Sequence, residues 1–542
     1  MSSRKELAAI GCAFLFAGSL WSAAPPTQVV STRPAPGPCA TRPYPTTSRP
    51  VKPILTGKDV WRFASAPSLR PMRVSVVVHR RGIARGRIFV APYSADRMVG
   101  QTGSMILGNS GDPVWFRPLP SARLQSADFQ VQAYRDPRTG RKEPVLTWWQ
   151  GTLAIPPAYT NLPSGAPEPG SCYYLYDSSY RLVRTVRARN GYAADEHEFT
   201  LVNGGRDALF IASKPVPLDL RPYGGPENGA IEDSEVQEIN LATGRLIFTW
   251  DMLSHVDPAD SEVSASTATS SGGVWDAFHM NSVDVGPRGQ LLISARNMWA
   301  VYDVSMRTGS ILWQIGGKKN DFSSGRNARF YWQHDARFRP GNKLSMFDDG
   351  CCNLPDGKPE QESHGLILKL DFRSWHVTAV RAYYHQPALF SATQGNLQRL
   401  RNGNEFVGWG ENAYYSEYQS AGNTARNALA SLLYDAKMPG SNISYRTFRY
   451  RWTGTPYYPP SLAVRGQVAY ASWNGSTLTR GWRVLEGSDP SHLRVVVWRA
   501  KSTGFETAVP VPGRALYYQV QALSATGKVL RSSRVAKTTK SG

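Results

Sequence analysis

The chain has 542 residues, of which 41% are hydrophobic and 11% aromatic, and its formal net charge is +21. This apolar content is sufficient to fill two packed domains, and it excludes an intrinsically disordered chain. The basic residues are spread along the sequence without a run of five or more Lys or Arg, so no nucleic acid is expected as a partner. The charge predicts instead a solvated basic surface that attracts small anions.

The first 24 residues are typical of a secretory signal peptide. Arg4 and Lys5 precede an apolar run over residues 7–20, and small residues follow as far as Ala24. The run is shorter than the roughly 20 residues that a membrane-spanning helix needs, and no later stretch is long enough. We therefore expect a secreted, extracellular protein without a membrane span. Residues 25–50, rich in Pro, Thr, Ser and Arg, are predicted to form a tether.

Loss of the signal peptide would leave four cysteines, Cys39, Cys172, Cys351 and Cys352. An even number of cysteines in an oxidising compartment indicates disulfides. The pairing stays open, because Cys39 could join Cys172 while the adjacent Cys351 and Cys352 pair with each other or with other partners. The cysteines lack CxxC spacing, so no zinc site, and no other metal site, is predicted.

Residues 51–445 consist of short predicted strands separated by turn residues. An apolar residue followed by Asp or Asn recurs at Asp177, Asn240, Asp303 and Asp371, at intervals of 63, 63 and 68 residues. Repeats of this length that contain only strands are typical of four-stranded propeller blades, and the ~65-residue pitch predicts six of them. A short helix is expected only over residues 425–434.

Residues 446–542 follow a different pattern, after a boundary at TGTPYYPPS (residues 453–461). About seven short strands with alternating polarity predict a small β-sandwich, and the segment resembles a fibronectin type III module. Its expected role is spacing or docking. The chain as a whole is thus predicted to be all-β, with a six-bladed β-propeller followed by a small β-sandwich.

Four segments within the repeats place an imidazole or an amide seven residues before a turn glycine. They are His197–Gly204, His279–Gly286, His334–Gly341 and Asn396–Gly403. Equivalent positions of a radial repeat face equivalent directions, so these four side chains are expected to converge on the central channel.

Residues 275–338 contain the largest number of these candidate polar groups. His279 and Asn281 are expected on one strand face because strand side chains alternate with period two, Arg296 ends the next strand, and His334 enters from the following blade. Two imidazoles, an amide and a guanidinium suit a tetrahedral oxyanion that one histidine attacks. The alternative for Arg296 is a structural salt bridge with Asp276 or Asp335.

Tryptophans offer a second kind of contact, since aromatic ligands stack on aromatic faces. Trp332 is a candidate substrate-binding residue. Trp148 and Trp409 are interpreted as core residues between the blades.

Several ordered motifs resemble the arylsulfotransferase family over roughly residues 75–435. They are LTWWQG (146–151), DEHEF (195–199), FHMNSVD (278–284), ISARN (293–297), WQIGGKKNDF (313–322), WQHDARF (332–338) and QGNLQRLRNGNEFVGWG (394–410). The resemblance implies a six-bladed propeller that moves a sulfuryl group from a phenolic sulfate ester to a phenol without a phosphoadenosine cofactor. The absence of a P-loop motif agrees with this.

The resemblance also implies roles for individual residues. His334 would be the nucleophile that becomes transiently sulfated, and His279, Asn281 and Arg296 would hold the sulfuryl oxygens. His197 would contact the substrate or move a proton. No cofactor is expected.

Two other functions stay open. A non-catalytic secreted propeller would use the channel to bind an anionic, aromatic or glycan ligand. Another hydrolase or lyase would use the carboxylates beside the histidines, which are those of Asp195, Glu196, Asp276 and Asp335. The sequence does not identify the donor, the acceptor or the oligomeric state.

Overall fold

The computed structural model describes residues 52–538, except residues 95, 122–123, 153–169, 271–272, 353 and 355–360. The predicted signal peptide, the tether and Cys39 lie outside the described residues. Regular structure in the described part consists of strands and short 3₁₀ turns. Among these elements, none is a helix long and apolar enough to cross a membrane.

Residues 75–450 form six sheets, called blades 1 to 6, whose strands pair almost entirely antiparallel. Blade 1 contains β27 (Phe448–Tyr450), β2 (Arg87–Val90), β3 (Gly103–Leu107) and β4 (Pro113–Pro118). Blade 2 contains β5 (Gln125–Arg135), β6 (Lys142–Gly151), β7 (Cys172–Tyr176) and β8 (Leu182–Val186). Blade 3 contains β9 (Ala193–Val202), β10 (Asp207–Pro217), β11 (Ala230–Asn240), β12 (Leu246–Asp251) and β13 (Val274–Trp275).

Blade 4 contains β14 (Met280–Val285), β15 (Gln290–Ala295), β16 (Ala300–Ser305) and β17 (Ile311–Gly316). Blade 5 contains β19 (His334–Arg339), β20 (Lys343–Asp348), β21 (His364–Asp371), β22 (His376–Tyr383) and β18 (Ser323–Ser324). Blade 6 contains β23 (Asn396–Arg399), β24 (Glu405–Gly408), β25 (Tyr414–Tyr418), β26 (Leu432–Lys437) and β1 (Ser75–His79). The 3₁₀ turns are η1 (Arg221–Tyr223), η2 (Pro258–Asp260), η3 (Ala265–Ser270), η4 (Arg296–Met298), η5 (Arg326–Ala328) and η6 (Ala425–Asn427).

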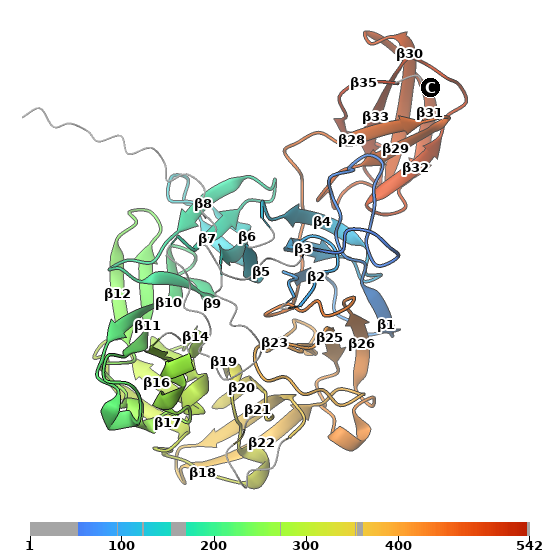
Figure 1. Cartoon of the computed structure of the whole chain (residues 1–542). Coiled ribbons are helices and arrows are strands. Elements are labelled where there is room, and N and C mark those ends of the chain that lie inside the picture. Colours follow the sequence, from blue (N-terminus) through green and yellow to red (C-terminus); the bar gives the residue numbers. More distant parts are fainter. Residues whose placement is uncertain are drawn as a thin grey trace, which may run out of the picture. The chain divides into compact units, whose positions relative to one another are not determined.

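The innermost strands of neighbouring blades contact one another in a closed cycle. It runs from β5 to β9, β14, β19 and β23, and then through β24 to β27 and back to β5 (Figure 1). Strand β27 follows blade 6 in sequence but is the inner strand of blade 1, and β1 precedes blade 1 but is the outer strand of blade 6. The two ends of the repeat region are therefore held in each other's sheets, which closes the propeller.

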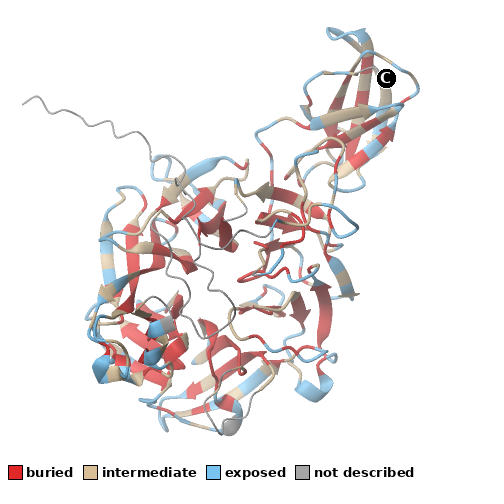
Figure 2. Cartoon of the chain, viewed as in Figure 1, coloured by how far each residue is buried: buried red, intermediate tan, exposed pale blue. Residues whose placement is uncertain are grey.

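Burial decreases from the inner to the outer strands, as Figure 2 shows. All six residues of β15 are buried, whereas the first four residues of the outer strand β12 alternate between partly buried and exposed. Trp148 and Trp409 are each about 1% exposed and are core residues, as predicted. The sequence-based expectation of a helix over residues 425–434 is wrong, because only η6 is helical and the chain enters β26 at Leu432. Pairing with β25 overrides the local helix preference there.

Residues 461–537 form a sandwich of two sheets, so the predicted fold class is confirmed. One sheet contains β28 (Ser461–Arg465), β29 (Val468–Ser472) and β32 (Glu506–Pro510). The other contains β31 (His492–Lys501), β30 (Gly481–Asp489), β33 (Tyr517–Leu523), β34 (Val529–Ser532) and β35 (Ala536–Lys537). Between them lies a core that includes Trp482, Val484 and Tyr518.

Of the four cysteines, Cys351 and Cys352 are joined to each other in a disulfide. Cys172 on β7 is buried and disulfide-bonded.

Candidate active site

A local break in strand pairing occurs on four of the inner strands. The antiparallel register shifts in β5 between Ala127 and Gln130, in β14 between Met280 and Ser282, and in β19 between His334 and Arg337. In β9, residues 195–198 oppose a single residue of β10. Such bulges re-aim side chains that regular alternation would send to the two faces of a sheet.

The bulge in β14 overturns one expectation. His279 precedes the strand with a φ of 49°, and Asn281 lies at the register shift. Period-two alternation therefore does not place these two side chains on one face. Their positions follow from the bulge and from their own hydrogen bonds.

Three histidines of the predicted register lie close together and are all buried. The ring centroids of His197 and His279 are 4.9 Å apart, and those of His279 and His334 are 6.4 Å apart. Every one of the three holds a carboxylate at Nδ1: Asp195 at 2.6 Å from His197, Asp276 at 2.6 Å from His279, and Asp349 at 2.7 Å from His334. A carboxylate at Nδ1 fixes the orientation of the ring and directs Nε2 away from it.

The protonation of His334 follows from its second hydrogen bond. The backbone N–H of Gln394 donates to His334 Nε2 at 3.1 Å, so Nε2 carries the lone pair and Nδ1 carries the proton that faces Asp349. Burial lowers the pKa of His334 well below its ordinary value, and the positive charge of Arg296 adds to this effect. His334 is therefore a neutral imidazole at pH 7 with its lone pair on Nε2.

The other two histidines differ from each other. Burial alone would lower the pKa of His197, but the carboxylates of Asp195 and Glu196 outweigh it and raise the pKa to about 9. Burial lowers the pKa of His279, although Asp276 opposes that change. At neutral pH one protonated imidazole thus lies beside a neutral one, which is the arrangement that proton transfer requires.

Arg296 begins η4 directly after β15. Its Nη1 donates to Asn297 Oδ1 and its Nη2 to the backbone oxygen of Ala392, both at 2.7 Å, and its guanidinium lies 4.6 Å from the ring centroid of Trp332. In the described part of the chain no carboxylate oxygen lies within 4.0 Å of Arg296, so the alternative salt bridge with Asp276 or Asp335 is not formed.

Several buried polar atoms near these groups lack hydrogen-bond partners among the described residues. They include Arg296 Nε, Asn281 Oδ1 and Asp349 Oδ1. Asn281 Nδ2 donates to the backbone oxygen of Gln333 at 2.7 Å, next to His334. Unpaired buried polar atoms are costly, and they are commonly retained where a ligand supplies the partner.

Asn396 does not join the cluster. Its Nδ2 donates to the backbone oxygen of Thr447 at 3.0 Å, and its Oδ1 accepts from the Thr447 N–H at 2.9 Å. The amide therefore ties β23 to the segment that closes the ring, and the substrate-binding role of Asn396 stays a prediction. Trp332 is buried against Trp299, with ring centroids 5.1 Å apart, and reaches the cluster through Arg296.

An ionic network that the sequence pattern did not predict lies on the same inner strands. Arg446, in the segment before β27, is fully buried and lies 3.1 Å from Asp128, 3.2 Å from Glu198 and 3.6 Å from Asp335. Its Nη2 also donates to the backbone oxygen of Asn281 at 2.9 Å. Arg446 lies just past the predicted end of the propeller at residue 445, outside the register pattern, so only the closure of the ring reveals its role.

A group of carboxylates surrounds His197. Burial and Asp195 raise the pKa of Glu196 to about 8, and burial together with Asp276 raises the pKa of Glu232 well above its ordinary value. Asp195, Glu196 and His197 place donor atoms within 4.8 Å of one another, a spacing that a metal ion could use. His197 Nδ1 and Asp195 already share a hydrogen bond, which a metal would have to displace.

The sequence model of the arylsulfotransferase (ASST) family matches residues 174–429. This segment includes His197, His279, Asn281, Arg296 and His334. No curated protein matches the chain.

Solved structures with propeller-like matches are remote in sequence. A protein of unknown function from Bacteroides caccae is 11% identical with a TM-score of 0.36, and the match covers 68% of this chain and all of that one. A Lactobacillus plantarum protein is 12% identical with a TM-score of 0.32, over 78% of this chain and 97% of that one. An inactive virginiamycin B lyase from Staphylococcus aureus is 6% identical with a TM-score of 0.32, over 74% and 97%.

Proposed function

We propose that this protein is an arylsulfotransferase that moves a sulfuryl group from an aryl sulfate ester to a phenol through a sulfated His334. The observation that supports this best is the convergence of three carboxylate-held histidines beside Arg296, within the segment that matches the ASST family model. His334 has the properties of a nucleophile, because it is neutral at pH 7 and its lone pair is fixed on Nε2.

In the first half-reaction, Nε2 of His334 attacks the sulfur of the ester. A nitrogen–sulfur bond forms while the bond between sulfur and the aryl oxygen breaks, and the aryl oxide leaves with the electron pair. His197, whose pKa is about 9, gives its proton to this oxygen. Its acidity is close to that of a phenol, with a pKa of ~10, as efficient general acid catalysis requires.

The sulfuryl oxygens need fixed donors during this step. Arg296 carries a permanent positive charge, and the Nδ2 group of Asn281 has one N–H left beside the bond to Gln333. One well-placed donor of this kind contributes about 3 kcal/mol to transition-state stabilisation. Asp349 holds the proton at Nδ1 of His334 and stabilises the positive charge that develops on the ring.

In the second half-reaction, a phenol replaces the departed aryl alcohol. Its hydroxyl gives a proton to His197 and its oxygen attacks sulfur, while the nitrogen–sulfur bond breaks and returns its electron pair to Nε2. The enzyme regains its starting state, so neither a cofactor nor a metal enters the cycle. The kinetics expected are ping-pong.

A binding propeller is the second candidate, and one observation favours it. The Gln394 N–H occupies the lone pair of His334, so attack on sulfur requires that hydrogen bond to open. In a non-catalytic protein the bond would simply persist, and the cluster would hold an anionic, aromatic or glycan ligand.

We also propose that the protein is secreted, on the basis of the predicted signal peptide. The C-terminal sandwich is proposed to be of the fibronectin type III kind, because its strand orders, β28-β29-β32 and β31-β30-β33-β34, suit that arrangement.

Intact-mass and peptide analysis after brief exposure to 4-nitrophenyl sulfate tests the transferase. The wild-type protein is expected to gain the mass of one sulfuryl group on His334 and to lose it when phenol is added. His334→Ala should gain none, whereas the matched control His376→Ala, a change on the outer strand β22, should behave as wild type. Absence of an adduct and of released nitrophenol, with 4-nitrophenyl sulfate still bound, would overturn the transferase in favour of the binding propeller.

A further inference from the structure

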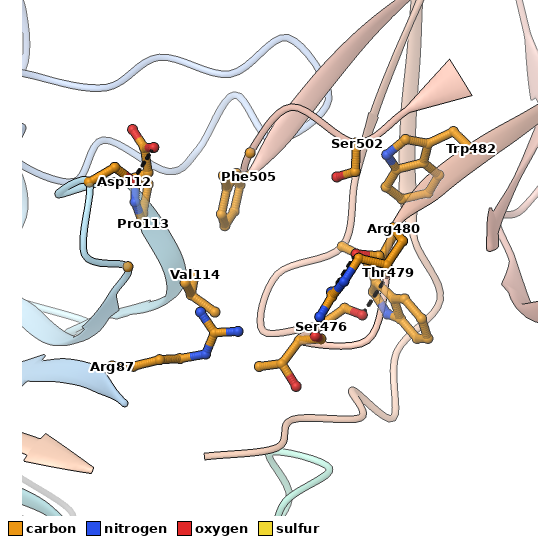
Figure 3. A pocket seen from close by; sticks show the side chains of 15 residues that line it. Arg87, Asp112, Pro113, Val114, Ser476, Thr479, Arg480, Trp482, Ser502 and Phe505 are labelled. Carbon is orange, nitrogen blue, oxygen red and sulfur yellow. Dashed lines mark hydrogen bonds between the residues drawn. The ribbon is translucent and has the colours of Figure 1, made fainter. Parts of the chain in front are cut away.

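A cavity lies between blade 1 and the C-terminal sandwich, and none of the three clustered histidines lines it. Its volume is about 230 Å³. Arg87 at the start of β2 reaches into it from the propeller, and Arg480 and Phe505 reach into it from the sandwich (Figure 3). The remaining walls come from the turn before β4 and from two loops of the sandwich.

Hydrogen bonds to the backbone, from side chains and from the opposite backbone, hold the two walls together. The Phe116 N–H donates to Asn474 Oδ1 at 3.0 Å, and Asn474 Nδ2 donates back to the Phe116 oxygen at 2.8 Å. The Gly475 N–H donates to the backbone oxygen of Val114 at 2.8 Å. On the far side, both oxygens of Glu506 accept from the backbone of residues 64–65. The cavity is therefore part of a bonded interface.

Two guanidinium groups share this cavity without a carboxylate partner. Arg87 makes no hydrogen bond or ion pair with any described side chain, and Arg480 Nη1 donates only to the backbone oxygens of Thr477 and Thr479, at 2.9 and 3.0 Å. Burial and the positive charge of Arg480 lower the pKa of Arg87, against an opposing contribution from Tyr180. A negative charge between the two arginines would relieve this repulsion and satisfy the fork of donors on Arg87.

The other lining groups limit what that anion can be. Asp112 also lines the cavity and accepts from Ser110 Oγ at 2.7 Å, so the walls carry two positive charges and one negative charge, which favours a single negative charge on the ligand. The hydroxyls of Ser476 and Thr479 lie near Arg480 and are hydrogen-bonded to each other at 2.7 Å, which leaves one of their two protons for a ligand, and the ring of Phe505 forms an apolar wall (Figure 3). Hydroxyl donors beside an aromatic face suit a sugar ring.

We propose that this cavity binds a saccharide that carries one oxyanion, a sulfate ester or a carboxylate, with the anion between Arg87 and Arg480 and the sugar ring against Phe505. This binding would place the propeller next to an acidic glycan and does not depend on sulfuryl transfer at His334.

Isothermal titration of the full chain at constant ionic strength tests the site with three probes: N-acetylglucosamine 6-sulfate, N-acetylglucosamine and sodium sulfate. The sulfated sugar is expected to bind more tightly than either of the other two. Arg87→Gln should weaken it by about tenfold or more, because a charge-assisted pair of hydrogen bonds is lost. Arg480→Gln should do the same from the opposite wall, and it keeps the test valid if the Arg87 variant does not fold.

Arg85→Gln is the matched control, since Arg85 is an exposed residue two positions before Arg87 and does not line the cavity. Equal losses in Arg85→Gln and Arg87→Gln would show a general effect of charge and overturn the site. An affinity unchanged in both cavity variants would place the binding elsewhere, as at the histidines. Free sulfate binding as tightly as the sulfated sugar would overturn the saccharide.

Discussion

The same inner strands carry two buried polar clusters that are built on opposite principles. In the network around Arg446, three carboxylates lie within 3.6 Å of a guanidinium nitrogen, and Arg337 adds a second cation that lies 2.7 Å from Asp335. In the histidine cluster, Arg296 donates to an amide and a backbone oxygen and has no carboxylate within 4.0 Å in the described chain, and Asn281 Oδ1 and Asp349 Oδ1 lack hydrogen-bond partners there. Paired charges hold the ring together, whereas unpaired donors and acceptors suit a site that a ligand completes.

The largest effect on stability is expected at Arg446. Arg446→Met removes the buried cation that lies beside the carboxylates of Asp128, Glu198 and Asp335. The loss of this charge should destabilise the fold by about 3–5 kcal/mol. Chemical denaturation measures this change. Arg451→Met, an exposed change five residues along, is the control and should stay within about 0.5 kcal/mol of wild type. Similar stabilities of the two variants would mean that the network is not what holds the inner strands together.

A substitution of Arg296 should lower the activity and leave the stability almost unchanged. Arg296→Lys keeps the charge but loses the forked donors, so sulfuryl transfer from 4-nitrophenyl sulfate should fall by about 10²–10³-fold with little change in unfolding midpoint. Arg307→Lys, an exposed change in the same blade, should leave kcat unchanged. A large loss of stability in Arg296→Lys would instead make Arg296 a structural residue like Arg446.

The smallest effect is a pH dependence set by the two kinds of histidine. His197 has its folded pKa raised to about 9, so its proton is present at neutral pH and is lost as the pH rises through about 9. The rate of aryl sulfate cleavage should fall as the pH rises through about 9. The protonated His197 contributes its full stabilisation below pH ~6.5, and this stabilisation should be lost as the pH rises from there through about 9. Burial lowers the pKa of His334, so its Nε2 should stay unprotonated as the pH falls to about 6.5.

His197→Asn separates these effects, because it removes the group that titrates near pH 9. Its pH–rate profile should be flat on the alkaline side and lower overall. An alkaline limb that persists in this variant would assign the titration to another group, such as Glu196, whose pKa is about 8.

Two N-glycosylation patterns in the chain show that a local sequence match does not by itself establish an accessible site. Asn442 and Asn474 are each the first residue of an Asn-x-Ser pattern for N-glycosylation. In the fold, Asn442 is fully buried and bonded to the backbone of Val99, and Asn474 is bonded to Phe116 across the sandwich interface. Both amides are occupied in the folded protein, so a glycan at either position would compete with the structure.

The sequence by itself determined the all-β class, the repeat pitch and the three histidines, because turn glycines and strand polarity are local signals that recur with the blade. Asn396 shares the same spacing, but its amide binds the Thr447 backbone whereas the three histidines each bind a carboxylate, so equal spacing did not determine equal contacts.

Only the tertiary structure decided how these groups meet. The bulges in β9, β14 and β19 set the directions of the histidines, and they depend on the pairing with neighbouring strands rather than on the residues alone. The Gln394 amide that fixes the lone pair of His334 comes from 60 residues away. Arg446 contacts groups on the inner strands of four blades. These groups are distant in sequence, and they surround its buried charge only because the ring closes.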